Sequence, residues 1–151
     1  MKTFASAAMA ACLLVTVGVL ASDVPSMIEK LKSKKPGIRA RAAENLGELG
    51  PGAASATDDL TAALKDSDPL VQTETMIALG RIGPAARAAV PALVAILKGE
   101  NARLGERAIE TLGAIGPDSA EAVPLLVEIL KGDDPSRATA AGVALARVLP
   151  P

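Results

Sequence analysis

Leu46-Gly47-Glu48-Leu49-Gly50-Pro51 is the stretch that decides the fold, because the chain repeats it. The later copies are Leu79-Gly80-Arg81-Ile82-Gly83-Pro84, Leu112-Gly113-Ala114-Ile115-Gly116-Pro117 and the degenerate Leu145-Ala146-Arg147-Val148-Leu149-Pro150. Each copy follows the last by 33 residues. A fixed period of this length is typical of repeat proteins, in which each copy is one structural unit.

A second block keeps the same register and predicts a first helix in each unit. Residues 90–98, Val-Pro-Ala-Leu-Val-Ala-Ile-Leu-Lys, match residues 123–131, and weaker copies cover residues 23–32 and 56–65. The closely spaced aliphatic residues of this block make a broad apolar face. Proline is well tolerated at the first position of a helix. We therefore expect helices that start at Pro25, Asp58, Pro91 and Pro124.

The repeated Leu-Gly stretch ends a second helix in each unit. Apolar residues fall on one side of this helix at helical spacing: Ile38, Ala42, Leu46 and Leu49, then Val71, Thr75, Leu79 and Ile82, then Leu104, Ala108, Leu112 and Ile115. Glycine inside a helix is less favourable than alanine by about 1 kcal/mol. The recurrence of Gly47, Gly80 and Gly113 therefore predicts that a neighbouring helix backbone comes close. The Gly-Pro pair that follows breaks the helix and starts a return loop.

These patterns predict an all-α, right-handed solenoid. Two short helices cannot bury their own apolar faces, whereas stacked pairs share one continuous core. The predicted repeats cover about residues 24–56, 57–89, 90–122 and 123–150. The composition agrees, because 50% of the residues are hydrophobic and Phe4 is the only aromatic residue. Alanine and leucine, which dominate, are strong helix formers.

The first 21 residues are predicted to form a separate signal peptide. Lys2 precedes a charge-free run from Phe4 to Leu20, and the small residue Ala21 suits a cleavage site. Residues 22–151 would then form the mature, exported protein, in the periplasm or secreted. The alternative is an uncleaved membrane anchor, because the charge-free run is near the lower length limit for a bilayer span. A lipoprotein signal would use Cys12, but the residues before it lack the usual leucine.

The repeat unit resembles the short HEAT repeat of the phycobilisome-lyase-like class. The resemblance rests on Val90-Pro91-Ala92-Leu93 and Leu79-Gly80-Arg81-Ile82-Gly83, and it covers about residues 22–150. It implies a protein-binding scaffold and does not identify a partner. The family usually carries an arginine after the apolar residue that opens the second helix. Only Arg39 fits that place, since its equivalents are Gln72, Gly105 and Ala138. The usual ladder of Asp–Arg pairs between units is therefore mostly missing.

Residue content argues against catalysis, a metal and a cofactor. Histidine, the commonest general base and metal ligand, is absent from the chain. Asp58-Asp59 and Asp133-Asp134 lack the alternating spacing of a calcium loop. The first pair is expected to open a helix, where negative charge is favourable, and the second to occupy a turn. We therefore expect that the protein is not an enzyme and that it binds neither a cofactor nor a metal ion.

Nucleic acid is also an unsuitable partner. The net charge is −1, and one dense basic run, formed by Lys30, Lys32, Lys34 and Lys35, is expected to be a solvated helix end. Phosphate recognition needs clustered cations, and single-strand binding adds aromatic stacking platforms that this chain lacks.

A protein partner is expected on the polar side of the second helices, on the concave surface that solenoids usually use. The candidate binding residues are Arg41, Glu44, Asn45, Glu48, Gln72, Glu74, Ile77, Arg81, Arg107 and Glu110. The alternative for these charges is ion pairing between neighbouring units.

The expected function is an exported, non-catalytic interaction module. The alternatives are a membrane-tethered solenoid and an accessory subunit or chaperone of an enzyme. The open ends of the solenoid could also self-associate.

Overall fold

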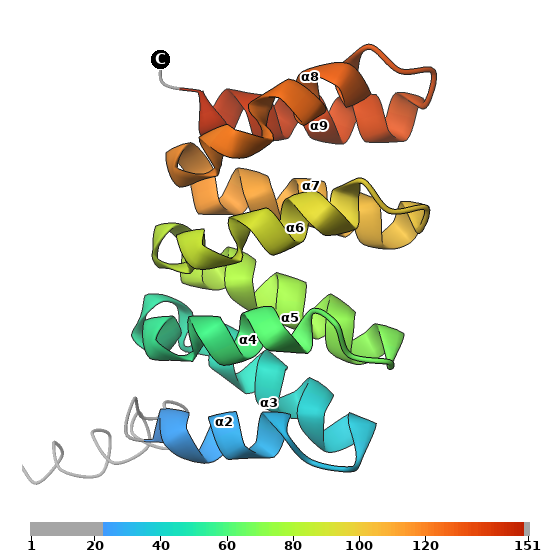
Figure 1. Cartoon of the computed structure of the whole chain (residues 1–151). Helices are drawn as coiled ribbons and strands as arrows, with labels where there is room; N and C mark the ends of the chain where they lie inside the picture. The colour runs from blue at the N-terminus through green and yellow to red at the C-terminus, as the bar shows by residue number, and fades with distance from the viewer. Residues whose placement is uncertain (1–22, 150–151) are drawn as a thin grey trace, which may run out of the picture.

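A computed structural model describes residues 23–149, which form a stack of helix pairs (Figure 1). The first helices of the pairs are α2 (Val24–Leu31), α4 (Thr57–Ala63), α6 (Val90–Leu97) and α8 (Val123–Leu130). The second helices are α3 (Pro36–Glu48), α5 (Pro69–Ile82), α7 (Ala102–Ile115) and α9 (Pro135–Val148). Three 3-10 segments lead to the next pair: η2 (Gly50–Ala56), η3 (Gly83–Ala89) and η4 (Gly116–Ala122). The expected all-α solenoid is confirmed, and the expected signal peptide, residues 1–21, lies outside the described residues.

The helices form two layers (Figure 1). The second helices α3, α5, α7 and α9 contact one another in succession along the whole stack. Neighbouring first helices have far fewer contacts with each other, because the 3-10 segments lie between the pairs. The layer of second helices is therefore the more closely packed one, which makes it the inner side of the stack.

The helix starts differ slightly from the expected ones and have clear local causes. Each first helix begins one residue earlier than expected. In α2, α6 and α8 the proline therefore takes the second helical position, where the N–H is also unpaired. Among the second helices, α5, α7 and α9 begin after Asp68, Asn101 and Asp134. Each of these side chains accepts hydrogen bonds from the first-turn N–H groups. The polar turns of the sequence thus serve as helix caps.

The return segments are more regular than the expected loops. Gly50, Gly83 and Gly116 have positive φ angles of 53°, 71° and 79°, which end the preceding helices. The residues after them form a 3-10 turn that buries some of its alanines, such as Ala53 and Ala86, and exposes others, such as Ala54 and Ala88. A buried segment must satisfy its own backbone hydrogen bonds. A 3-10 helix does so within a few residues.

One aliphatic core runs through the described residues. Fully buried leucines recur at the same place in successive units: Leu60, Leu93 and Leu126 on the first helices, and Leu46, Leu79 and Leu112 on the second. The predicted apolar rows are therefore largely confirmed. Ile38 is the exception, because its side chain is 41% exposed while its equivalent Val71 is buried. Ile38 lies on the side of α3 that faces away from α5, where the described residues place no preceding repeat.

Glycine lets the second helices approach each other closely. A Cβ atom built on Gly47 would lie 2.9 Å from Cα of Ala78 on the next helix. A Cβ on Gly113 would lie 3.0 Å from Cα of Ala144. Gly80 is less crowded, since its nearest neighbour would be the Cβ of Ala114 at 3.4 Å. The expected close approach is thus confirmed, and two of the three seams depend on it.

One partly buried ion pair joins the first repeat to the second. Arg39 donates two hydrogen bonds to Asp66, of 2.6 and 2.7 Å, and a third to the carbonyl oxygen of Ser33. The side chains of the pair are only 14% and 11% exposed. The hydrogen bond from Arg39 lowers the pKa of Asp66, and the backbone N–H of Asp68 adds to this against the cost of burial. The later seams between the described repeats have no ion pair equivalent to Arg39–Asp66, as the sequence predicts.

We predict that Gly47→Ala lowers the free energy of unfolding by about 1–3 kcal/mol, because the added methyl group overpacks the α3–α5 seam. Gly80→Ala is the matched control at the same repeat position. It should be neutral or should stabilise by up to about 1 kcal/mol, because alanine favours the helix. Urea unfolding followed by circular dichroism measures both. Equal effects of the two substitutions would contradict the seam argument.

We also predict a pH-dependent contribution from Asp66. Its pKa is lowered by folding, so its stabilisation is present above the unfolded-state value of about 3.9 and is lost as the pH falls through the lower folded-state value. Asp66→Asn should lower the urea midpoint at pH 7, and this difference should shrink below about pH 4. Asp133→Asn, at an exposed turn, is the control and should change the midpoint little at either pH. A constant difference between wild type and Asp66→Asn would refute the role of the carboxylate.

Candidate functional site

A pocket of about 230 Å³ lies in the groove between α5 and α7, on the inner layer. Gly80 leaves room for it, and Ile77 and Ala114 give it apolar walls. Arg81 and Arg107 line the same pocket, from α5 and α7 respectively. The site thus combines an apolar hollow with charged groups.

The structure brings four of the ten predicted residues together at this pocket: Ile77, Arg81, Arg107 and Glu110. Ile77 is half-buried and Arg81 is exposed. Arg107 forms an ion pair with Glu110, one helical turn along α7. That pairing leaves Arg81 as the cation at the pocket without an ion pair among the described residues.

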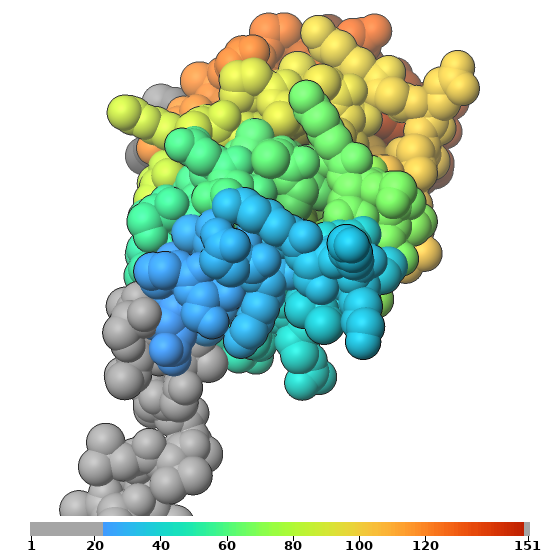
Figure 2. Space-filling model, turned by 60° about the horizontal axis from the view of Figure 1, so that its bottom comes forward, coloured from blue at the N-terminus to red at the C-terminus, as the bar shows by residue number. Residues whose placement is uncertain are grey.

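The other six predicted residues lie elsewhere. The amide of Gln72 donates to the carbonyl oxygen of Leu64 at the end of α4, so it is used within its own repeat. Asn45 is the equivalent of Ala78, which faces the preceding helix, so Asn45 faces the N-terminal end of the stack. Figure 2 shows this end, which α2 and α3 form. The remaining four are outside the described pockets, and all are exposed or half-buried: Arg41, Glu44, Glu48 and Glu74.

A second pocket, of about 200 Å³, lies in the next groove, between α7 and α9. Gly113, Ala140, Val143 and Arg147 line it, together with Glu110, which borders both pockets. Apart from Glu110, these residues are absent from the predicted set. The 33-residue period could have found them, since Gly113 and Val143 follow Gly80 and Glu110 by one repeat.

Ion pairing between units does not explain the charges of the inner layer. Residues 23–149 contain two ion pairs that join different repeats, Arg39–Asp66 and Lys32–Asp59. Neither includes a predicted binding residue. The expected alternative, a network of inter-repeat pairs along the second helices, is therefore not seen in this part of the chain.

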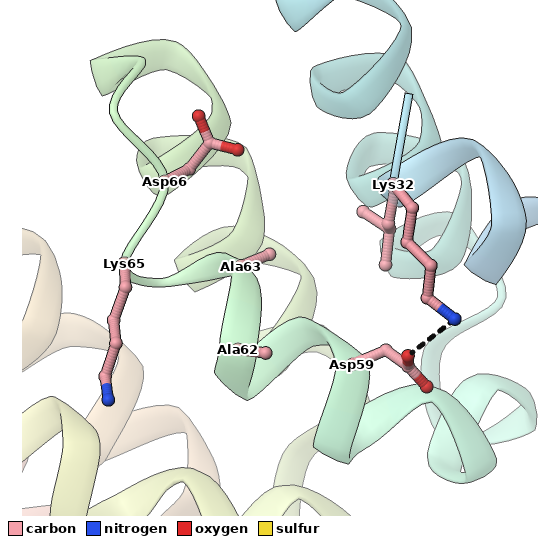
Figure 3. Close-up of a pocket in the computed structure, with 7 residues that line it drawn as sticks. Lys32, Asp59, Ala62, Ala63, Lys65 and Asp66 are labelled. Atoms are coloured by element: carbon pink, nitrogen blue, oxygen red, sulfur yellow. Dashed lines mark ion pairs between the residues drawn. The ribbon is translucent and has the colours of Figure 1, made fainter. Parts of the chain in front are cut away.

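A further pocket, of about 260 Å³, lies between α2 and α4 (Figure 3). Lys32 and Asp59 point toward each other across it and are 3.6 Å apart, whereas Lys65 points away (Figure 3). Glu29 and Asp59 together raise the pKa of Lys32. Asp66, which also lines this pocket, is bound to Arg39. The charged groups here are therefore largely paired with one another, which makes the pocket a poor binding site.

The expected roles of the acidic pairs are partly visible. Asp58 and Asp59 lie in the first turn of α4, where the helix dipole favours them, and Asp134 caps α9.

Within residues 23–149, no three His, Cys, Asp or Glu side chains gather as a metal site would need. The two buried hydroxyl groups without hydrogen-bond partners, on Thr75 and Ser119, are fully shielded from solvent.

Comparison with known proteins agrees with this architecture. A family model of HEAT repeats matches residues 24–89 and 84–146. Crystal structures of two engineered proteins from the Northeast Structural Genomics Consortium are similar, with TM-scores of 0.66 and 0.64 and 26% sequence identity in both cases. Each match covers 83% of this chain, but only 62% and 63% of the engineered proteins. No curated protein matches the sequence significantly.

The family match is broader than the class suggested by the sequence motifs. It extends over nearly all of the described residues and supports HEAT repeats, without selecting the phycobilisome-lyase-like class. The engineered structures share the stacked arrangement of helices. From its repeated sequence, its helix pairs and these matches, the chain belongs to the HEAT-repeat family.

Proposed function

We propose that this protein is an exported, non-catalytic interaction module that binds a protein partner on its inner layer. The observation that carries this proposal is the α5–α7 pocket, where Ile77 and Gly80 offer an apolar hollow beside Arg81. Interfaces bind through apolar anchors that enter such hollows, surrounded by polar groups that fix orientation. Membership of the HEAT-repeat family supports the same role, because the extended inner surface of a solenoid suits a macromolecular ligand.

The chemistry of the chain supports a role without catalysis. The sequence has no histidine, and its single cysteine, Cys12, lies in the segment that export would remove. Ser119, which lacks a hydrogen-bond partner, is buried and therefore has no access to a substrate. The binding groove offers mainly arginine, glutamate and aliphatic groups. These groups suit recognition of a peptide better than the activation of a nucleophile.

The charge distribution favours a protein over nucleic acid or anionic lipid. The basic run near the end of α2 is partly neutralised, because Lys32 pairs with both Glu29 and Asp59. At the groove, Arg107 is paired with Glu110. A phosphate backbone would need several adjacent free cations. A protein segment with one or two carboxylates is the better match.

The location of the protein is also part of the proposal. We infer that residues 1–21 direct export and that cleavage after Ala21 releases the solenoid. Among the described residues, the one stretch with the length and composition of a membrane span is Pro69–Leu97. It is divided into α5, η3 and α6 and turns sharply at Gly83, so it belongs to the core of the solenoid.

We predict that charge reversal at the groove abolishes partner capture. Residues 22–151, immobilised and exposed to the native envelope or secreted fraction, should retain a partner that mass spectrometry can identify. Arg81→Glu combined with Arg107→Glu should lose that partner and keep a helical circular dichroism spectrum. Arg87→Glu, at an exposed position of η3, is the control and should bind normally. Capture that survives the double reversal would remove the inner layer as the binding surface.

Processing of the N-terminus is predicted separately. Mass spectrometry of the protein isolated from its native cells should find a chain that starts at Ser22. An intact Met1 in the membrane fraction would instead support the tethered alternative. Recovery of the protein in a stable complex with an enzyme, with a change in that enzyme's activity, would favour the accessory-subunit alternative.

A further inference from the structure

The groove between α5 and α7 extends beyond the pocket beside Gly80. Two further pockets, of about 170 Å³ each, continue it toward the N-terminal ends of both helices. The nearer of them shares Arg107 and Glu110 with the pocket beside Gly80, and it shares Thr73 and Arg103 with the farther one. Because they share walls, the three hollows form one continuous groove that follows both helices.

The two ends of this groove are apolar and its middle is polar. Ile77 and Ala114 line one end, and Leu70 and Leu104 line the other. Between them, Thr73 and the charged side chains of α7 form the walls. Leu70 is 56% exposed, so its end of the groove presents apolar surface to solvent. A ligand with an aliphatic group for each end and polar groups between them would match this pattern.

The lining residues also follow a regular spacing. Each wall contains a row with steps of three, four and three residues: Leu70, Thr73, Ile77 and Gly80 on α5, and Leu104, Arg107, Thr111 and Ala114 on α7. The two rows run in the same direction, since Leu70 shares a pocket with Leu104, and Gly80 shares one with Ala114. Such spacing is the one by which a helix packs along another helix.

The length of the groove follows from the geometry of one helix. The helix α5 is continuous from Pro69 to Ile82. Leu70 and Ile77 are seven residues apart on it, so they are separated by two turns, or roughly 10.5 Å along the axis. The whole row from Leu70 to Gly80 rises by about 15 Å.

An α-helix is the regular conformation that stays in register with these rows. A helix laid along the groove has the same rise as its walls, so its residues at steps of three, four and three face the four layers in turn. A β-strand repeats on one face about every 6.6 Å. A polyproline II segment repeats roughly every 9 Å. Neither of these repeats matches all four layers.

The charges of the groove indicate an acidic ligand. Arg81 lines the end beside Gly80, and Arg103 lines the end beside Leu70. Within residues 23–149, neither arginine forms an ion pair, whereas Arg107 between them pairs with Glu110. Arginine binds carboxylates through paired hydrogen bonds. Acidic side chains near both ends of a bound helix would therefore complement the two unpaired cations.

We propose that the partner binds through an amphipathic α-helix that lies along the α5–α7 groove. This helix has two aliphatic side chains seven residues apart, polar residues between them on the same face, and acidic residues near both ends. The aliphatic side chains fill the two apolar ends, and the acidic residues pair with Arg81 and Arg103. This inference rests on the proposed function, because it assumes that the inner layer binds protein. It adds the conformation, the anchor spacing and the charge of the bound segment.

Synthetic helical peptides test the inference on residues 22–151. The probe is a fluorescent, alanine-rich peptide of eighteen residues with leucine at the fifth and twelfth positions, glutamine at the eighth and ninth, and glutamate at the first and sixteenth. One control moves the second leucine to the tenth position, on the opposite side of the helix. A second control replaces both glutamates with lysine, and a third places proline at the ninth position to break the helix.

Fluorescence anisotropy should show that the probe binds roughly tenfold more tightly than each control. Equal binding of the probe and any one control would overturn the proposal, because each control removes one required feature of the ligand. No binding of the probe at millimolar concentration would overturn it as well.

Variants of the protein locate the bound helix. Leu70→Gln removes the apolar wall at one end of the groove, and Ala114→Leu fills the other end. Each should weaken probe binding roughly tenfold. Leu130→Gln, at a comparably exposed leucine of α8 outside the groove, is the matched control and should leave binding unchanged. Circular dichroism should show the same helical spectrum for all three variants.

A double variant tests the role of charge. Arg81→Gln combined with Arg103→Gln should remove the preference for the glutamate peptide over the lysine peptide. Probe binding that none of these substitutions changes would place the peptide outside the groove and refute the inference.

Failure of this inference is distinguishable from failure of the proposed function. If a natural partner is captured through Arg81 and Arg107 while the probe does not bind, the inner layer binds protein in another form. The helical ligand is then wrong, and the interaction module stands.

Discussion

Close contact between successive second helices is the constraint on which the structure depends. At Gly47 and Gly113 the next helix backbone lies where a side chain would begin. This proximity brings the aliphatic rows of α3, α5, α7 and α9 together into one continuous core. Glycine also borders two pockets of this layer, since the missing side chains of Gly80 and Gly113 leave room in the grooves. Packing and recognition therefore have the same local origin.

The fold could be read from the sequence because its signal is repeated. Leu46, Leu79 and Leu112 share one place in the period, and all three are fully buried. Local details were harder to predict. The 3-10 turns after Gly50, Gly83 and Gly116 follow from the burial of small residues such as Ala53, Ala86 and Ser119, which becomes apparent only when the helices are placed. Ile38 was misplaced because a periodic pattern does not distinguish a terminal repeat from an internal one.

The candidate site was only half predictable, for a related reason. Charged residues on the polar side of a helix are visible in sequence, and Arg81, Arg107 and Glu110 were found in this way. Gln72 belongs to the same pattern, yet its amide is used by the end of α4. Ala140 and Val143 were missed because small aliphatic residues are common throughout the chain, although they follow Arg107 and Glu110 by one 33-residue repeat. Only the groove between two helices gives them a role.

Because the Arg39–Asp66 ion pair occurs at the first seam and not at the later ones described, stability is distributed unevenly along the solenoid. In a linear array, stability is approximately a sum over units and their nearest-neighbour seams. The first seam has a partly buried ion pair in addition to its packing. The last seam relies on the packing of α7 against α9 and on one exposed hydrogen bond from Ser136 to Glu106. Thermal fraying should therefore begin at the C-terminal end. A partner bound on the inner layer of that weaker half would stabilise it, so that binding and resistance to local unfolding would rise together.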